Sequence, residues 1–110
     1  MVEQSLQLSL IFGSLADPTR RDILTRVARK VLSINEVAAP YDLTLAAVSK
    51  HVKILEKAKL IVKQRKGKQQ FITLSPVAIN NASKYLTHYE KIWNMRLDNL
   101  ENYLLALPKS

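Results

Sequence analysis

The chain has 110 residues, a length typical of one compact domain and too short for most large catalytic scaffolds. Its apolar fraction of 47% and charged fraction of 24% indicate a globular protein with a buried core. Lys and Arg number 17 against 9 for Asp and Glu, and the resulting net charge of +8 favours a polyanionic partner, either nucleic acid or an anionic membrane surface. The absence of cysteine excludes disulfides, thiolate metal sites and cysteine nucleophiles, and two glycines are too few for a glycine-rich phosphate loop.

Neither a signal peptide nor a transmembrane segment is predicted. The first residues lack a basic region followed by an apolar run, and no apolar stretch approaches the roughly 20 residues that a bilayer requires. We therefore expect a cytoplasmic protein without a membrane partner.

The excess positive charge lies in one short segment. Residues 1–49 carry as many acidic as basic side chains, whereas residues 50–70 carry eight basic side chains against the single Glu56. The eight are Lys50, Lys53, Lys57, Lys59, Lys63, Arg65, Lys66 and Lys68. Such a run can be merely a solvated face, so its meaning depends on the structure that carries it.

Two helices are predicted before residue 30. Residues 6–15 form a leucine-rich helix that is too short to be stable without a packing partner. Asp17 and Pro18 then read as an N-cap and a proline at the first helical position. The helix that they open turns three apolar side chains inward at helical spacing, namely Ile23, Leu24 and Val27.

Two further helices follow, separated by a tight connection. Ser33 and Glu36 fit a capping box at the start of a short helix that Pro40 ends. Thr44 is the expected N-cap of the next helix, over residues 45–59. Its apolar stripe consists of Leu45, Val48, Val52, Leu55 and Ala58.

After Lys59 the hydrophobic period changes from helical to alternating. Residues 60–65 and 69–74 are predicted strands of a hairpin with its turn at Lys66 and Gly67, where glycine supplies a positive φ. The expected inward side chains are Leu60, Val62, Ile72 and Leu74. Ser75 and Pro76 then open a last helix over about residues 77–107, which would span about 45 Å if unbroken.

These elements together define a mainly α fold with a small β-hairpin wing, a winged helix-turn-helix. In such a fold the second helix of the helix-turn-helix enters the major groove of DNA and the wing lies along a phosphate backbone. Small side chains at the start of the helix over residues 45–59 allow close approach to base edges, and the lysines beyond them can reach phosphates. This arrangement accounts for the position of the basic segment.

The sequence resembles the ArsR family of winged-helix transcription regulators. The resemblance rests on Leu15–Leu24 (LADPTRRDIL), Leu43–Leu55 (LTLAAVSKHVKIL) and Leu60–Lys68 (LIVKQRKGK). It implies a homodimer that binds operator DNA, usually as a repressor, and predicts a palindromic operator. Lys59 departs from the family pattern, which commonly has glycine before the wing. The predicted DNA-binding residues are Thr44, Ala46, Ala47, Ser49, Lys50, His51, Lys53, Arg65, Lys66 and Lys68.

Many members of that family sense metals, and here the sequence departs from them. It has no cysteine, and His88, Glu90, Asp98 and Glu101 lack the spacing of the family's histidine and carboxylate sites. We therefore expect no metal and no cofactor. A catalytic site is not expected either, since Ser49 and His51 are two residues apart on one helix and point to different sides.

His51 has two interpretations. The resemblance suggests a contact with the DNA backbone, whereas the ring could instead fill the gap between helices as a hydrogen-bonded polar residue.

The last helix carries an apolar seam. Residues 93, 97, 100, 104 and 107 alternate steps of four and three, as in a coiled coil, and a domain this small has limited interior for so long a helix. We expect a single domain over residues 1–110 that dimerises through helices at residues 1–16 and 76–107, with the DNA-binding part at residues 17–75. The predicted dimer interface comprises Leu8, Ile11, Phe12, Tyr89, Trp93, Leu97, Leu100 and Leu104.

Two other functions remain open. A winged helix without specific DNA binding could serve as a protein-interaction module that holds an acidic partner. A nonspecific architectural nucleic-acid binder would use the same lysines without preferring any sequence. The operator and the effector cannot be read from the sequence.

Overall fold

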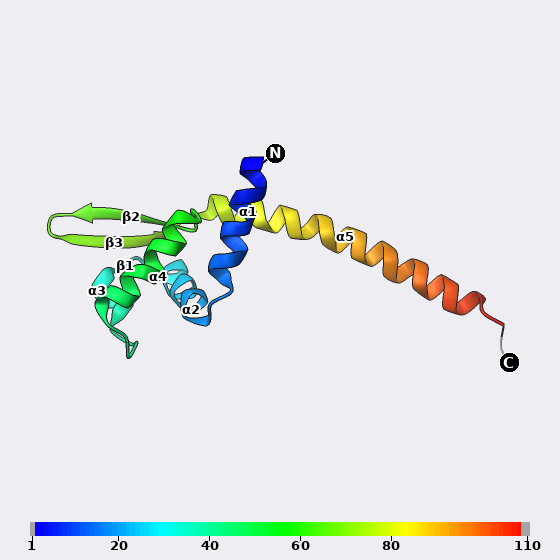
Figure 1. The fold of residues 1–110 in the computed structure, drawn as a ribbon, viewed down its shortest axis with the longest axis horizontal. Coiled ribbons are helices and arrows are strands. Elements are labelled where there is room, and N and C mark those ends of the chain that lie inside the picture. Colours follow the sequence, from blue (N-terminus) through cyan, green and yellow to red (C-terminus); the bar gives the residue numbers. More distant parts are fainter. Residues whose placement is uncertain (1, 109–110) are drawn as a thin grey trace. The chain divides into compact units, whose positions relative to one another are not determined.

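The computed structural model describes residues 2–108, which fall into two compact units divided between Asn80 and Asn81. The elements of the first unit are helices α1 to α4, a three-stranded sheet and the start of α5, and the remainder of α5 makes up the second unit (Figure 1). In chain order they are α1 (Val2–Leu15), α2 (Pro18–Arg29), β1 (Leu32–Ser33), α3 (Ile34–Ala38), α4 (Leu45–Lys57), β2 (Ile61–Lys66), β3 (Gln69–Leu74) and α5 (Pro76–Ala106).

Side-chain caps start the helices where the sequence predicts. The Asp17 carboxylate accepts a hydrogen bond from the Arg20 backbone N–H at 3.0 Å, and the Thr44 hydroxyl accepts one from the Ala47 N–H at 3.1 Å. Ser33 and Glu36 form both hydrogen bonds of the capping box. These contacts satisfy backbone donors that would otherwise have no partner at the first turn of α2, α3 and α4.

The sheet contains a strand that the sequence did not reveal. The order is β1-β3-β2, with both pairs antiparallel, so the short β1 adds to the outer edge of β3. Two residues are too few for a recognisable alternation, and their pairing partners, Ile72 and Phe71, lie far along the chain. The hairpin projects from the helices of its unit (Figure 1) and turns at Gly67, whose φ is 63°.

The inward face of the hairpin begins one residue later than expected. Val62 is 43% exposed, which corrects the prediction that it points inward, whereas Ile61 is buried. Lys59 has a φ of 62° and ends the helical turn in the left-handed conformation that usually favours glycine, as the family pattern implies. Leu60 therefore precedes the strand, and the alternation starts at Ile61.

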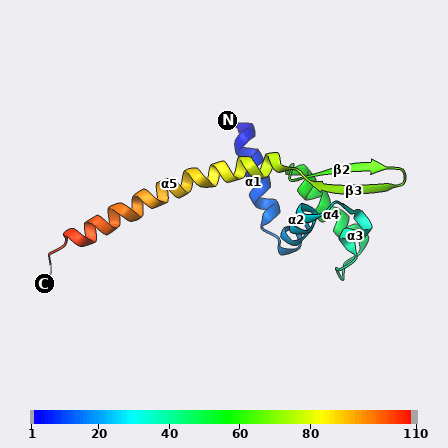
Figure 2. The ribbon, with the colours of Figure 1, turned by 180° about the vertical axis from the view of Figure 1, so that it is seen from behind.

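The core of the first unit lies between the helices and the sheet. Every helix from α1 to α4 contributes to it, and Leu45 is the one predicted stripe residue of α4 that is exposed, at 50%. It occupies the first position of the helix, where the chain has not yet turned onto the core. Seen from behind (Figure 2), α1 lies against α2 and α4, and Ile11 of α1 is fully buried. The buried apolar residues of this unit are Ile11, Ile23, Leu24, Val27, Leu32, Val37, Val48, Val52, Leu55, Ala58, Leu60, Ile61, Ile72 and Ala78.

The second unit is the part of α5 beyond Asn80. The bounds of α5 as a whole agree with the predicted last helix to within one residue at each end. Ala82 is buried, and the large apolar side chains that follow are exposed, including Trp93, Leu97, Leu100 and Leu104. No helix among the described residues combines the length and apolar character needed to cross a bilayer.

The capping box makes the stability of the fold depend on pH. The backbone N–H of Ser33 donates to Glu36 at 3.0 Å, and this hydrogen bond and the Ser33 hydroxyl hold the pKa of Glu36 below its ordinary value of 4.5. Because the pKa of Glu36 is lower in the folded state, its ionised carboxylate stabilises the fold at pH values above the ordinary pKa. This stabilisation is lost as the pH falls through the lowered pKa. Glu36→Gln keeps the capping geometry but cannot titrate. We expect its urea midpoint to lie below the wild-type midpoint at about pH 6, and the gap to narrow as the pH falls below 4.5. A gap independent of pH would contradict this.

Candidate nucleic-acid interface

Helix α4 separates an apolar face from a polar one. Val48, Val52 and Leu55 are buried in the core. Ala46, Lys50 and Lys53 are exposed, and Ala47 and Ser49 are half-buried. The short side chains at the start of the helix therefore leave its backbone accessible, and the two lysines extend from the same helix.

The hairpin faces α4 across a shallow depression of about 390 Å³. The cross-strand pairs Lys63–Ile72 and Arg65–Gln70 place these four residues on one face of the hairpin, because directly opposed residues of an antiparallel pair share a face. That face is apolar at Ile72, inside the core, and polar nearer the tip. The depression is lined by Ile34, Ala46, Ser49, Lys50, Val52, Lys53, Lys63 and Gln70.

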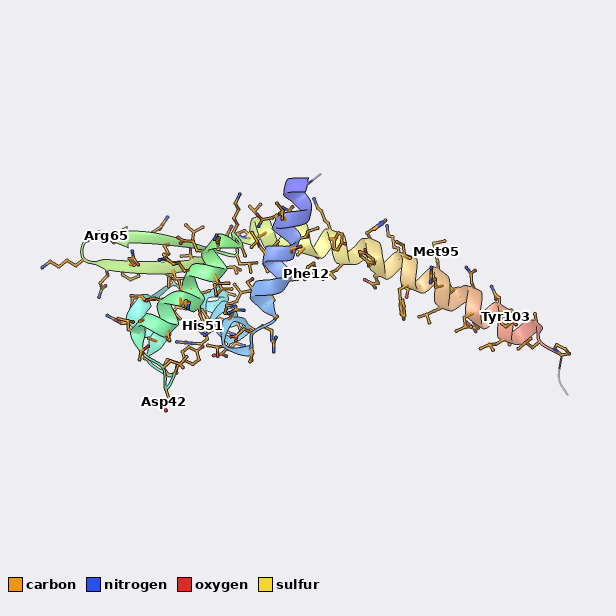
Figure 3. The ribbon with its side chains drawn as sticks, in the orientation of Figure 1. Phe12, Asp42, His51, Arg65, Met95 and Tyr103 are labelled. Carbon is orange, nitrogen blue, oxygen red and sulfur yellow. The ribbon has the colours of Figure 1, made fainter. Side chains whose placement is uncertain are left out.

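A second depression, of about 340 Å³, lies closer to the hairpin tip. Ile34 and Gln70 line both hollows, so the two are adjacent. Arg65 lies near the tip (Figure 3), where its Nε donates to the Gly67 carbonyl at 3.2 Å. The residues lining this depression are Ser33, Ile34, Asn35, Arg65, Lys68, Gln69 and Gln70.

Most of the positive charge here is not neutralised. Glu56 forms an ion pair with Lys63, with Oε1 and Nζ 3.3 Å apart. Within residues 2–108 the other seven basic side chains of the 50–70 segment form no ion pair. Five predicted cations are thus available to an anionic ligand along α4 and the hairpin: Lys50, Lys53, Arg65, Lys66 and Lys68.

Sequence reasoning missed four polar residues of α3 and the hairpin that line these depressions. They are Asn35 on α3, and Lys63, Gln69 and Gln70 on the hairpin. The strand alternation could have found Lys63, because it is two residues from Arg65 and so shares its face. Asn35 comes close only through the pairing of β1 with β3, which the sequence does not predict.

His51 lies where α4 passes α2 (Figure 3), with its Nδ1 3.2 Å from an Arg20 guanidinium nitrogen and 3.9 Å from the Asp17 carboxylate. This geometry agrees with the interpretation in which the ring fills the gap between helices, and a contact with DNA stays a prediction. The pKa of Asp17 is held below its usual range, chiefly by the hydrogen bond from the Arg20 backbone and further by the charge of Arg20.

Arg26 and Tyr41 brace the connection between α3 and α4. Arg26 donates to the carbonyls of Glu36 and Val37, each at 2.8 Å, and its guanidinium lies 5.3 Å from the centre of the Tyr41 ring. The Tyr41 hydroxyl donates to Asp22, and burial together with this carboxylate raises the pKa of Tyr41. These contacts fix the turn that presents α4.

The predicted dimer residues occupy different environments. On α1, Phe12 is exposed, Leu8 is half-buried, and Ile11 is 0% exposed. Ile11 therefore belongs to the protomer core and offers no surface to a second copy in this conformation, which corrects its inclusion in that face. On α5, all five predicted residues are exposed: Tyr89, Trp93, Leu97, Leu100 and Leu104.

The described residues contain no group of three or more His, Cys, Asp or Glu side chains arranged to hold a metal ion.

Comparisons with known proteins agree with this architecture. A family model described as a helix-turn-helix domain matches residues 15–64. The HTH-type transcriptional regulator Rv2034 of Mycobacterium tuberculosis is 31% identical over 84 residues, covering 76% of each chain. A transcriptional repressor SmtB homolog of Synechocystis is 29% identical over 80 residues, which cover 73% of this chain and 61% of the relative. The crystal structure of an ArsR family transcriptional regulator has a TM-score of 0.77 at 30% identity, covering 82% of this chain and 93% of its own.

The fold and the basic surface define a helix-turn-helix regulator of transcription that binds DNA. Within this class, the sequence identity to Rv2034 and the structural match to an ArsR family regulator identify the family. The chain belongs to the ArsR family of transcriptional regulators.

Proposed function

We propose that the protein represses transcription by binding a palindromic operator as a homodimer in the cytoplasm. In this proposal α4 enters the major groove, with Ala46, Ala47 and Ser49 near base edges, and Lys50 and Lys53 reach phosphates. Arg65, Lys66 and Lys68 lie along the backbone beside it. The observation that carries the proposal is the basic depression that α4 and the hairpin share.

The proposal assigns each protomer one half-site. A two-fold symmetric dimer would present two α4 helices to successive major grooves about 34 Å apart on one side of the duplex. The repressor role is supported by the name of the SmtB homolog and by the family. Because the chain lacks cysteine, we propose that its effector is not a thiolate-bound metal.

Selection of bound duplexes from genomic DNA tests this function. An enriched site with inverted half-sites would support it, and its position relative to a promoter would test repression. Failure to enrich any sequence would contradict specific binding and favour the nonspecific binder. In a pull-down, an acidic protein partner that stays bound when duplex DNA is added would favour the interaction module.

Substitutions on α4 and on the hairpin should have different signatures. We expect Lys66→Ala combined with Lys68→Ala to weaken binding to all duplexes in the same proportion, because phosphate contacts carry no sequence information. Ser49→Ala should change the ranking of operator variants, with about 1–3 kcal/mol of discrimination lost at the base pair it contacts. Affinities for a panel of single-base operator variants measure both effects. Identical rankings for the two variants would contradict this division of roles.

A further inference from the structure

One side chain joins the end of α1 to α4. The Arg20 Nε donates to the Ser14 carbonyl at 2.7 Å, and one terminal nitrogen donates to the Gly13 carbonyl at 3.3 Å. The other terminal nitrogen lies 3.2 Å from the His51 Nδ1. Arg20 therefore holds the last turn of α1 with two nitrogens and the middle of α4 with the third.

The chemistry of this contact fixes the state of the His51 ring. A guanidinium carries only donors, so the Nδ1 nitrogen must accept, and the ring proton resides on Nε2. Arginine is suited to this task, because its planar fork presents several N–H groups at fixed angles, whereas lysine carries its donors at one point. The Asp17 carboxylate, at the start of α2, accepts from the Arg20 backbone N–H and lies 3.9 Å from the His51 Nδ1, which is too far for a hydrogen bond to the ring.

A second contact ties α1 to the far end of α4. The Gln7 side-chain amide donates to the Ala58 carbonyl at 2.7 Å, at the C-terminal cap of α4. Helix α1 is thus tied to α4 at its middle, through Gln7, and near its C-terminal end, through Arg20. The polar ties complement the apolar contact that buries Ile11. A shift of α1 would therefore act on α4 through these two hydrogen bonds as well as through the direct contacts between the two helices.

We propose that Arg20 is a positioning residue that sets the orientation of α4 relative to α1. In the dimer, this orientation lets both α4 helices fit the two half-sites of the operator. This inference rests on the proposed function, in which α1 contributes to the dimer and α4 reads DNA. Two half-sites about 34 Å apart amplify a small tilt of α4 into a mismatch at the groove. A random duplex, bound through phosphates, tolerates that tilt.

Arg21 provides a matched control for Arg20. Its guanidinium also donates to a carbonyl at the end of α1, that of Leu15, at 2.8 Å, and within residues 2–108 it forms no hydrogen bond or ion pair with α4. Arg20→Gln and Arg21→Gln therefore remove the same charge and a similar contact with α1. They differ in the link to His51 and in the second, longer hydrogen bond of Arg20, to the Gly13 carbonyl.

The test compares the affinity for the selected operator with the affinity for a random duplex of equal length, at one salt concentration. We expect Arg20→Gln to lose about tenfold more affinity for the operator than for the random duplex, as for a lost hydrogen bond to a charged group. Arg21→Gln should lower both affinities in the same proportion. Thermal unfolding of each variant identifies any general loss of stability.

Substitutions of His51 keep the inference testable should Arg20→Gln fold poorly. His51→Gln retains an acceptor oxygen for Arg20 and should lower the ratio of operator to random affinity less than His51→Ala, which should lower it about tenfold. Adding Arg20→Gln to His51→Ala should lower the ratio no further, because both changes remove one interaction.

An imidazole nitrogen NMR spectrum tests the contact without DNA. We expect the wild type to have an unprotonated Nδ1 that accepts a hydrogen bond, and its shift should move in Arg20→Gln but not in Arg21→Gln. Operator binding that responds equally to both arginine substitutions, or an unchanged imidazole shift, overturns the role of Arg20 alone. A wild type that enriches no sequence overturns the proposed function instead.

Discussion

Raising the salt concentration from about 50 to about 200 mM should weaken operator binding on the order of 10⁴-fold. The physical reason is counterion release, since each phosphate that a cation neutralises frees a condensed ion from the duplex. If each protomer neutralises about four phosphates, the dimer should show a slope of log affinity against log salt near −7. Five cations of the interface have no acidic partner in the described part of the chain, which is enough for such a number.

Lysine substitutions locate the origin of this slope. Lys66→Ala combined with Lys68→Ala removes two cations per protomer and should make the dimer slope less negative by about 3.6. The matched control is Lys84→Ala combined with Lys91→Ala, which removes the same charge from exposed positions on α5. That control should leave the slope almost unchanged. Equal slopes for the two pairs would mean that net charge, rather than the surface of α4 and the hairpin, drives binding.

Features specified by neighbouring residues were predictable from the sequence. Asp17, Ser33 and Thr44 were each expected to cap a helix, and the structure confirms all three, because a cap depends on contacts three residues away. The burial of Val48, Val52 and Leu55 followed from helical periodicity in the same way.

Features that depend on distant partners were not predictable. The strand β1 exists because it pairs with β3, some 40 residues later in the chain. The inward face of β2 was misjudged at Val62, because its phase depends on how α4 ends at Lys59.

The candidate site follows the same division. Its α4 residues follow one local helical pattern. Lys63 and Gln70 line the same depression only because the hairpin packs beside α4 in the folded chain. The Arg20–His51 contact joins residues 31 positions apart, and no periodicity in the sequence predicts it.

Leu100→Asp is expected to convert the protein to a monomer and to reduce operator affinity on the order of 10²–10⁴-fold. Leu100 is 52% exposed and lies in the seam with Trp93, Leu97 and Leu104, so a carboxylate there would be buried against a partner copy. Loss of the dimer removes the effective concentration with which the second half-site is bound. Sedimentation should then give the 12.5 kDa mass of one chain.

Met95→Asp is the matched control, because it introduces the same charge on the same helix outside the seam. Met95 (Figure 3) is 64% exposed, and helical periodicity places it opposite Leu100. This variant should sediment as a dimer and bind the operator as the wild type does. Since both substitutions lie beyond Asn80, unfolding of the winged-helix unit should be alike in the two proteins. A Leu100→Asp protein that remains dimeric would show that α5 associates through another face, and a Met95→Asp monomer would identify that face.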